Sequence, residues 1–233
     1  MKPSGYSTTL IVLIQFILQF SGLSAQDSGT FTDARDEQQY EWIRIGKQVW
    51  MAENLAWLPA VNPYGESGFE VKYYYVYGYN GHDLQAATST EAYKQYGALY
   101  NYTAALHCCP AGWHLPADAE WKELEAFLGM KVVPGNRSWI NDGEVGRKLK
   151  SAEGWHGNNG TDDAGFNALP GGCRGYGGFE GMGFCGYFWT ASPAGDDNGW
   201  RRGICADANG ICREEDRRYF GVSVRCVRDA GAQ

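Results

Sequence analysis

The stretch from residue 108 to residue 124 constrains the fold of this chain more than any other part of its sequence. It reads Cys-Cys-Pro-Ala-Gly-Trp-His-Leu-Pro and continues as Ala-Asp-Ala-Glu-Trp-Lys-Glu-Leu. Pro116 suits the start of a helix, because its φ is fixed near the helical value and its missing N–H is not needed there. Trp121, Leu124 and Leu128 then recur with helical spacing, and a glycine follows as a left-handed C-cap. The stretch predicts a short amphipathic helix directly after a cysteine pair.

The first 25 residues predict an export signal. Lys2 precedes an apolar run from Leu10 to Phe20, and small residues follow up to Ala25. The run includes two glutamines, so it is too short and too polar to span a bilayer. We expect cleavage after Ser24 or Ala25, and a mature protein that is secreted, periplasmic or at the cell surface and does not insert into the membrane.

The rest of the chain is long enough for one domain with a full core. The net charge is −7 and no basic cluster is present, which excludes nucleic acid as a partner, because such binding requires phosphate neutralisation. With 32 glycines and 15 tyrosines, the composition indicates turns and aromatic packing, not disorder. We divide the chain into a signal peptide (1–25), a loose polar leader (26–39), a domain (40–229) and a tail (230–233).

All seven cysteines lie in the exported part, where disulfides are the expected state. We predict three bridges, one from the adjacent pair to the last strand and two between near neighbours: Cys108 or Cys109 with Cys226, Cys173 with Cys185, and Cys205 with Cys212. The first bridge encloses more than a hundred residues and is worth up to about 4.7 kcal/mol in the chain-entropy model. Zinc is the alternative, but the sequence has no C-x-x-C pair.

Periodicity predicts an α+β domain. Residues 42–45 and 48–51 form a hairpin, with Gly46 at the first position of a two-residue turn. Residues 98–106 have the apolar spacing of a second short helix. In the last strand, 220–226, every second residue is apolar and faces the core. We therefore expect two short helices, twisted antiparallel strands and long disulfide-braced loops.

Two irregular regions carry the candidate ligand-binding residues. In residues 73–79 aromatic side chains recur at every second position, which suits either sugar stacking or, as the spacing favours, the paving of a sheet. The candidate ligand contacts are all aromatic: Tyr73, Tyr75, Tyr77, Trp155 and Trp200. A Gly-rich loop at 158–167 supplies hard oxygen ligands for Ca²⁺, although such residues usually cap turns. The candidate ligands of Ca²⁺ are Asn158, Asp162, Asp163 and Asn167.

No G-x-S-x-G, H-E-x-x-H, phosphate-loop or dinucleotide-binding motif is present, so the sequence indicates a non-catalytic protein.

Several segments together resemble a known family, the Fibrobacter succinogenes major paralogous domain. They follow one another in order over roughly residues 40–229: 45–55, 73–79, 109–116, 118–121, 165–172, 188–190 and 223–229. The resemblance implies an exported bacterial domain whose scaffold is related to C-type-lectin-like and formylglycine-generating-enzyme folds. It also implies that the family's recurrent cysteine pair corresponds to Cys109 and Cys226. Ala117 departs from the family's usual Ser or Thr, so the helix loses the hydroxyl of its capping box.

We therefore expect a binding or adhesion module of the bacterial cell surface or periplasm, with a glycan or a surface protein as its partner. Two alternatives remain. One is an enzyme of the formylglycine-generating type that uses Cys205 and Cys212 as a reactive pair. The other is a purely structural surface domain.

Overall fold

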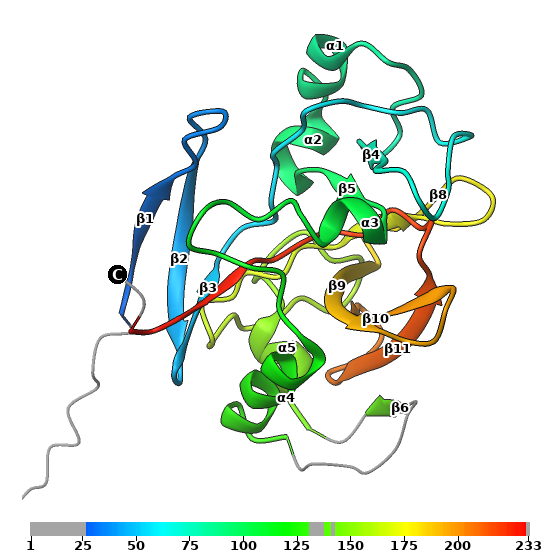
Figure 1. The fold of residues 1–233 in the computed structure, drawn as a ribbon. Helices are drawn as coiled ribbons and strands as arrows, with labels where there is room; N and C mark the ends of the chain where they lie inside the picture. Colours follow the sequence, from blue (N-terminus) through cyan, green and yellow to red (C-terminus); the bar gives the residue numbers. More distant parts are fainter. Residues whose placement is uncertain (1–26, 131–137, 141–142, 232–233) are drawn as a thin grey trace, which may run out of the picture.

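The computed structural model describes residues 27–130, 138–140 and 143–231, so the predicted signal peptide lies outside it (Figure 1). The described part is a mixed α+β structure, dominated by strands. No helix within it is long and apolar enough to cross a membrane.

Two larger sheets and one small sheet organise the described residues (Figure 1). The first has the order β1-β2-β3-β12 and consists of β1 (Ser28–Thr32), β2 (Gln39–Ile45), β3 (Gln48–Met51) and β12 (Val227–Asp229). The second has the order β6-β11-β10-β9-β7-β8 and consists of β6 (Ser138–Ile140), β7 (Gly171–Arg174), β8 (Phe179–Met182), β9 (Cys185–Pro193), β10 (Asn198–Cys205) and β11 (Ile211–Arg217). The small sheet pairs β4 (Tyr74–Tyr75) with β5 (Leu99–Tyr100).

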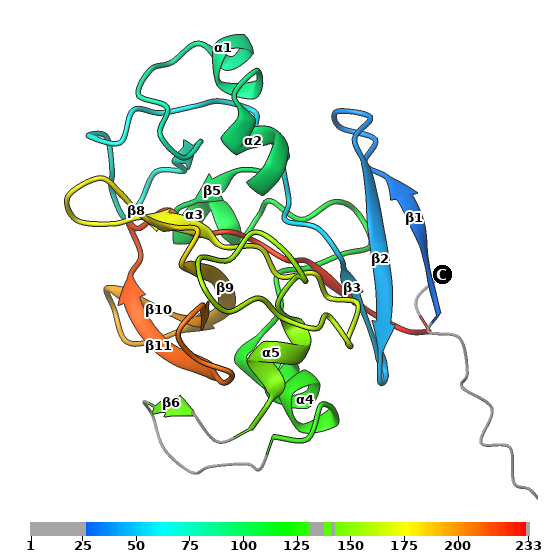
Figure 2. The ribbon, with the colours of Figure 1, turned by 180° about the vertical axis from the view of Figure 1, so that it is seen from behind.

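The helices are short: α1 (Leu84–Thr88), α2 (Glu91–Tyr96), α3 (Tyr102–Ala105), α4 (Asp118–Phe127) and α5 (Val145–Leu149). The C-terminal segment crosses from the second sheet to the first and ends in β12 (Figure 1). The long connection between α5 and β7 lies on the side of the molecule that faces the viewer in Figure 2.

The predicted hairpin is confirmed. β2 pairs with β3 from Trp42↔Met51 to Ile45↔Gln48. Gly46 has φ +62°, as a turn with glycine at its first position requires.

The polar leader, in contrast, is not loose. Residues Ser28 to Thr32 form β1 and pair with β2. Gly29 leaves room for the Trp42 indole, because a Cβ there would lie 2.8 Å from the ring. Phe31 stacks on Trp113 at 4.6 Å between ring centroids. The contacts of Gly29 and Phe31 thus attach this segment to the domain, although its polar composition predicted a loose leader.

The predicted central helix is confirmed as α4. Trp121 and Leu124 are fully buried on its inner face, and Gly129 has φ +101° beyond its end. Asp118 in the first turn accepts hydrogen bonds from Arg202 (2.8 Å) and Arg213 (2.6 Å) of the second sheet. Burial opposes ionisation of Asp118, but the bonds from these cations outweigh it and hold the pKa of its carboxyl well below the usual range. Charge pairing therefore fixes α4 to the sheet from its first turn.

Restoring the missing cap of α4 should stabilise the protein. Ala117 has extended backbone at the N-cap, and its N–H already donates to the Glu120 carboxylate at 2.7 Å. We expect Ala117→Ser to raise the free energy of unfolding by about 1 kcal/mol, because its hydroxyl would accept a free N–H of the first turn. Urea titration measures the change. Ala119→Ser, inside the helix, is the control, and an equal or larger gain there would contradict the capping account.

The second predicted helix is shorter than expected. Residues 99–100 belong to β5, and α3 spans only Tyr102–Ala105. Asn101 ends the strand and caps α3, because its side chain accepts the N–H of Ala104 at 3.0 Å. An apolar spacing that fits a helix thus covers a strand, a cap and one helical turn.

The long-range disulfide is confirmed and the two short-range ones are wrong. Cys109 is bonded to Cys226, and the second bridge joins Cys185 to Cys205. Cys205 lies directly opposite Cys185 in the β9–β10 ladder, with their Cα atoms 4.1 Å apart. Cys212 instead lies opposite Gly203, which makes it a diagonal neighbour of Cys205, at a spacing of roughly 7–8 Å that a disulfide does not span. Buried free thiols remain at three positions: Cys108, Cys173 and Cys212.

Candidate ligand-binding groove

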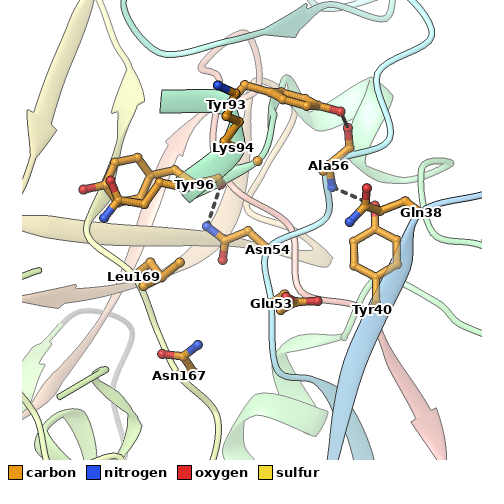
Figure 3. A pocket seen from close by; sticks show the side chains of 12 residues that line it. Gln38, Tyr40, Glu53, Asn54, Ala56, Tyr93, Lys94, Tyr96, Asn167 and Leu169 are labelled. Carbon is orange, nitrogen blue, oxygen red and sulfur yellow. Dashed lines mark hydrogen bonds between the residues drawn. The ribbon is translucent and has the colours of Figure 1, made fainter. Parts of the chain in front are cut away.

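Two hollows meet at Asn167, and we call them together the Asn167 site. The first has a volume of about 110 Å³ and is lined mainly by the exit of the hairpin and the end of α2 (Figure 3). Its lining residues are Gln38, Tyr40, Glu53, Asn54, Ala56, Tyr93, Lys94, Gln95, Tyr96, Gly97, Asn167 and Leu169. The second, of about 390 Å³, lies between β1, β2 and the loop that contains Asp162 and Asn167. Its lining residues are Ser28, Gly29, Thr30, Glu41, Trp42, Ile43, Ala52, Asp162, Gly165 and Asn167.

A buried arginine supports the Asn167 site from below. Arg225 is fully buried and donates to Asn54 Oδ1 (2.8 Å) and to the backbone oxygens of Met51 (3.2 Å), Phe166 and Asn167 (2.6 Å). Its guanidinium also lies over the Phe166 ring, 4.7 Å from the centroid. Burial lowers the pKa of Arg225 to about 9, so the guanidinium is still charged at neutral pH. One cation therefore connects the hairpin exit, the Phe166–Asn167 loop and the C-terminal segment.

The side-chain amides of the two asparagines of the site differ in their hydrogen bonds. The Asn54 amide donates to the Tyr96 oxygen at 2.9 Å and accepts from Arg225, so its polar atoms are engaged. Asn167 has φ +51°, and its N–H donates to Asp162 Oδ1 at 2.7 Å. The side-chain amide of Asn167 has no hydrogen-bond partner among the described residues, and it lines both hollows (Figure 3). Its backbone is fixed while its amide is available to a ligand.

The rest of the lining combines acids with fixed tyrosine rings. Glu53 accepts the N–H of Glu41 with one carboxylate oxygen, at 3.0 Å. Tyr40 accepts the N–H of Ala56 at 3.0 Å, and Tyr93 donates to the oxygen of the same residue at 2.8 Å (Figure 3). Both phenol rings are therefore held by one backbone unit. Such a lining offers amide and carboxylate groups beside aromatic carbon.

Burial raises the pKa of Asp162, which lines the second hollow, while the Asn167 N–H and the charge of Arg225 act in the opposite direction. With Glu41 and Glu53 nearby, the site is acidic on one side. Lys94, at the far end of the first hollow, is its cationic side chain, and it also pairs with Glu91 at 2.7 Å. The distribution of charge favours a neutral or cationic ligand over an anionic one.

Two of the five predicted aromatic contacts are corrected, because they are buried. Tyr75 is 0% exposed and donates to the Glu66 oxygen, and Trp155 is 5% exposed and donates to Ser151. Neither ring can offer a face to a ligand.

The other three predicted aromatic contacts are partly exposed. Tyr73 stacks against Tyr75, Tyr77 packs on Phe179, and Trp200 lies under Arg213 at 3.5 Å. None of the three lines the Asn167 site.

Two of the four predicted calcium ligands, Asn158 and Asp162, have protein partners. The Asn158 amide donates to Asn209 at 2.9 Å, and Asp162 accepts the N–H of Asn167 at 2.7 Å. Three backbone oxygens near this loop, those of Asn158, Cys205 and Ala208, instead receive the buried Lys150 ammonium. No group of three or more His, Cys, Asp or Glu side chains in the described part of the chain could hold a metal ion.

The predicted reactive pair is also absent, because Cys205 is bonded to Cys185. Cys212 is fully buried, and burial raises the pKa of its thiol to about 12. A thiol in this state is not a nucleophile at neutral pH.

Sequence reasoning missed Arg225, Glu53 and Gln38 as site residues. Alternation placed Arg225 on the face of the last strand opposite its apolar side chains, which hid its burial. Glu53 and Asn54 directly follow the predicted hairpin, and no local pattern marks them as site residues. The sequence did mark the loop that contains Asn167, but it was interpreted as a calcium-binding loop.

Comparison with known proteins gives a family but no close relative. The family model described as the Fibrobacter succinogenes major domain matches residues 43–228. No curated protein and no solved structure matches the chain. The match covers most of the chain and includes both ends of the Cys109–Cys226 bridge. The chain belongs to the Fibrobacter succinogenes major domain family.

Proposed function

We propose that the chain is an exported, non-catalytic binding module of the cell surface or periplasm that recognises a saccharide at the Asn167 site. The observation that carries the proposal is the Asn167 side chain: its amide has no partner in the described part of the chain, while its backbone is held by Asp162 and the buried Arg225. A ligand group that meets this amide encounters a fixed partner, so little entropy is lost on binding.

The chemistry of the lining suits hydroxyl groups. An amide offers both a donor and an acceptor, and a carboxylate accepts strongly, so Asn167 and Glu53 together can bind neighbouring hydroxyls. The half-buried ring of Tyr93 adds apolar surface for the C–H groups of a sugar. The acids on one side favour a neutral or amine-bearing saccharide over one with carboxylates.

We also propose a C-type-lectin-like scaffold for the domain. A long-range disulfide that joins the start of the central helix to the C-terminal segment supports this, as do the long loops between α5 and β7. Calcium is not part of the proposal, because Asp162 accepts the Asn167 N–H and the Asn158 amide donates to Asn209. A surface protein is the second candidate partner, and the formylglycine-generating alternative has lost its cysteine pair.

A glycan array, run with and without Ca²⁺ on the mature protein, tests the proposal. We expect binding to neutral or amine-bearing saccharides that does not depend on Ca²⁺. Titration calorimetry with the best array ligand should then show at least a tenfold loss of affinity in Asn167→Gly. Glycine accepts the positive φ of residue 167, so the change removes the amide and keeps the backbone.

The contribution of charge is tested by Glu53→Gln in the site. Glu123→Gln, which removes the same charge on the exposed side of α4, is its control. We expect the first to weaken binding several-fold and the second to leave it unchanged. No saccharide bound on the array, or an Asn167→Gly variant that binds as tightly as the wild type, would overturn the proposal.

A further inference from the structure

A second surface, away from the Asn167 site, carries large exposed aromatic side chains. It is built from three segments of the chain, and we call it the aromatic surface: Tyr64, Phe69, Val71, Tyr176 and Tyr219. The first four are 41%, 38%, 60% and 73% exposed. Exposed apolar side chains that gather in one place mark interaction sites more often than single ones do.

Ring contacts join the three segments into one surface. Tyr219 meets Phe69 with 5.2 Å between centroids, and Tyr176 with 6.0 Å. Tyr176 also rests edge-on against the buried Phe220, 4.8 Å away. Tyr64 packs on Phe179 of β8, 6.2 Å away. Phe69, Tyr176 and Tyr219, more than a hundred positions apart from the first to the second, thus lie in ring contact, and Tyr64 lies beside Gly178 of the loop that carries Tyr176.

The backbone under these rings is fixed by two buried side chains. Arg174, 5% exposed, donates to the oxygens of Tyr64 (2.8 Å) and Tyr219 (3.3 Å). Asn101, fully buried, donates to the oxygens of Gly68 (3.0 Å) and Val71 (2.7 Å). The rings are therefore exposed on rigid supports, which lowers the entropy cost of binding.

Polar groups lie among the rings. The Tyr176 phenol interacts electrostatically with Arg217 and with Tyr219. Arg217 is 42% exposed and pairs with Asp197 at 3.0 Å. Phenol and guanidinium groups therefore border the ring faces, and Val71 is the one aliphatic member of the patch.

The size of the patch decides between classes of partner. Three rings exposed by about half and one valine present roughly 400 Å² of surface. A stable protein–protein interface needs about 800 Å² from each partner. A short run of sugar units needs less, and its C–H faces stack on rings while its hydroxyls bond to phenol and guanidinium groups.

We propose that the aromatic surface is a second saccharide-binding face, which takes a polysaccharide chain by ring stacking. The inference rests on the proposed function for its ligand class, but its residues are separate from those of the Asn167 site. A chain bound at both places would gain avidity without new contacts.

Native affinity electrophoresis tests the inference, with soluble glucan, xylan and mannan each cast into a gel as the probe. We expect at least one of these to retard the wild type, and Tyr176→Ala to raise the dissociation constant tenfold or more. Tyr176→Phe keeps the ring and should retain most of the retardation. Phe127→Ala, which removes an equally exposed ring on α4, should migrate like the wild type.

The outcomes separate the two proposals. If Tyr176→Ala is retarded like the wild type, or if none of the three polysaccharides retards the protein, the aromatic surface is not a saccharide face. Array binding that is lost in Asn167→Gly would still support the Asn167 site. Conversely, if Tyr176→Ala loses retardation and Asn167→Gly binds the array like the wild type, the aromatic surface is supported and the Asn167 site is not. Pull-down of a protein partner that depends on Tyr176 and not on saccharide would also contradict the inference.

Discussion

Replacing Arg225 with methionine is expected to lower the free energy of unfolding by about 3–4 kcal/mol. Methionine fills a similar volume but donates nothing, so Asn54 and the backbone oxygens of Met51, Phe166 and Asn167 lose a common partner inside the protein. Each buried acceptor without a donor costs about 1–3 kcal/mol, and relaxation recovers part of the sum. Denaturant titration measures the change.

The size of the effect depends on the forked shape of the guanidinium, which gives a second comparison. Arg225→Lys keeps the charge but offers donors from one point, so we expect an intermediate loss of stability. Arg147→Met removes an exposed cation that pairs with Glu144, and should change stability by no more than about 0.5 kcal/mol. Equal stability of Arg225→Met and Arg147→Met would show that Arg225 does not hold the site together.

The second large effect concerns the two disulfides. Removal of the Cys109–Cys226 bridge by a double Cys→Ala change should destabilise the protein by about 4 kcal/mol, and removal of the Cys185–Cys205 bridge by about 3 kcal/mol. The difference follows from loop length, because the first bridge spans 117 residues and the second spans 20. Denaturant titration under non-reducing conditions measures both.

Cys108→Ala is the matched control for the disulfide variants. This thiol is buried, forms no disulfide and donates only to the Ala105 oxygen, so its loss leaves a small cavity and should cost less than either bridge. A larger loss on removing Cys185–Cys205 than on removing Cys109–Cys226 would contradict the assignment of the long bridge as the main covalent constraint.

The parts of the fold that could be predicted are those with local signals. The central helix has apolar spacing, a proline at its start and a glycine at its end, and it is present as α4. The hairpin has a glycine in its turn and is present as β2 and β3. The long disulfide followed from the family's recurrent cysteines and from a predicted strand at 220–226, although the last strand of the structure, β12, begins only at Val227. Each of these needs only a few neighbouring residues or one resemblance.

The parts that could not be predicted depend on cross-strand register and on three-dimensional burial. The Cys185–Cys205 pair exists because β9 and β10 place these residues opposite each other, and no spacing in the chain reveals that register. Tyr75 and Trp155 have the residue type of a sugar contact, but neighbouring loops cover them. Arg225 alternates away from the apolar side chains of its segment, yet the segment runs between two sheets and buries both of its faces (Figure 1).

For the same reason the sequence predicted only part of the Asn167 site. The loop that contains Asp162 and Asn167 was singled out for its oxygen atoms, but as a calcium loop. Its actual neighbours, Glu53 and Asn54, come from the hairpin exit more than a hundred residues earlier. Tertiary contacts through Arg225 bring these segments together, and the sequence carries no local mark of them.

Hydrogen exchange followed with and without the best array saccharide tests the central claim most directly. If the saccharide binds at the Asn167 site, backbone amides at residues 38–41, 53–56 and 162–169 should exchange more slowly in its presence, while those of α4 stay unchanged. Protection confined to segments outside these three, or no protection at saturating saccharide, would contradict the account.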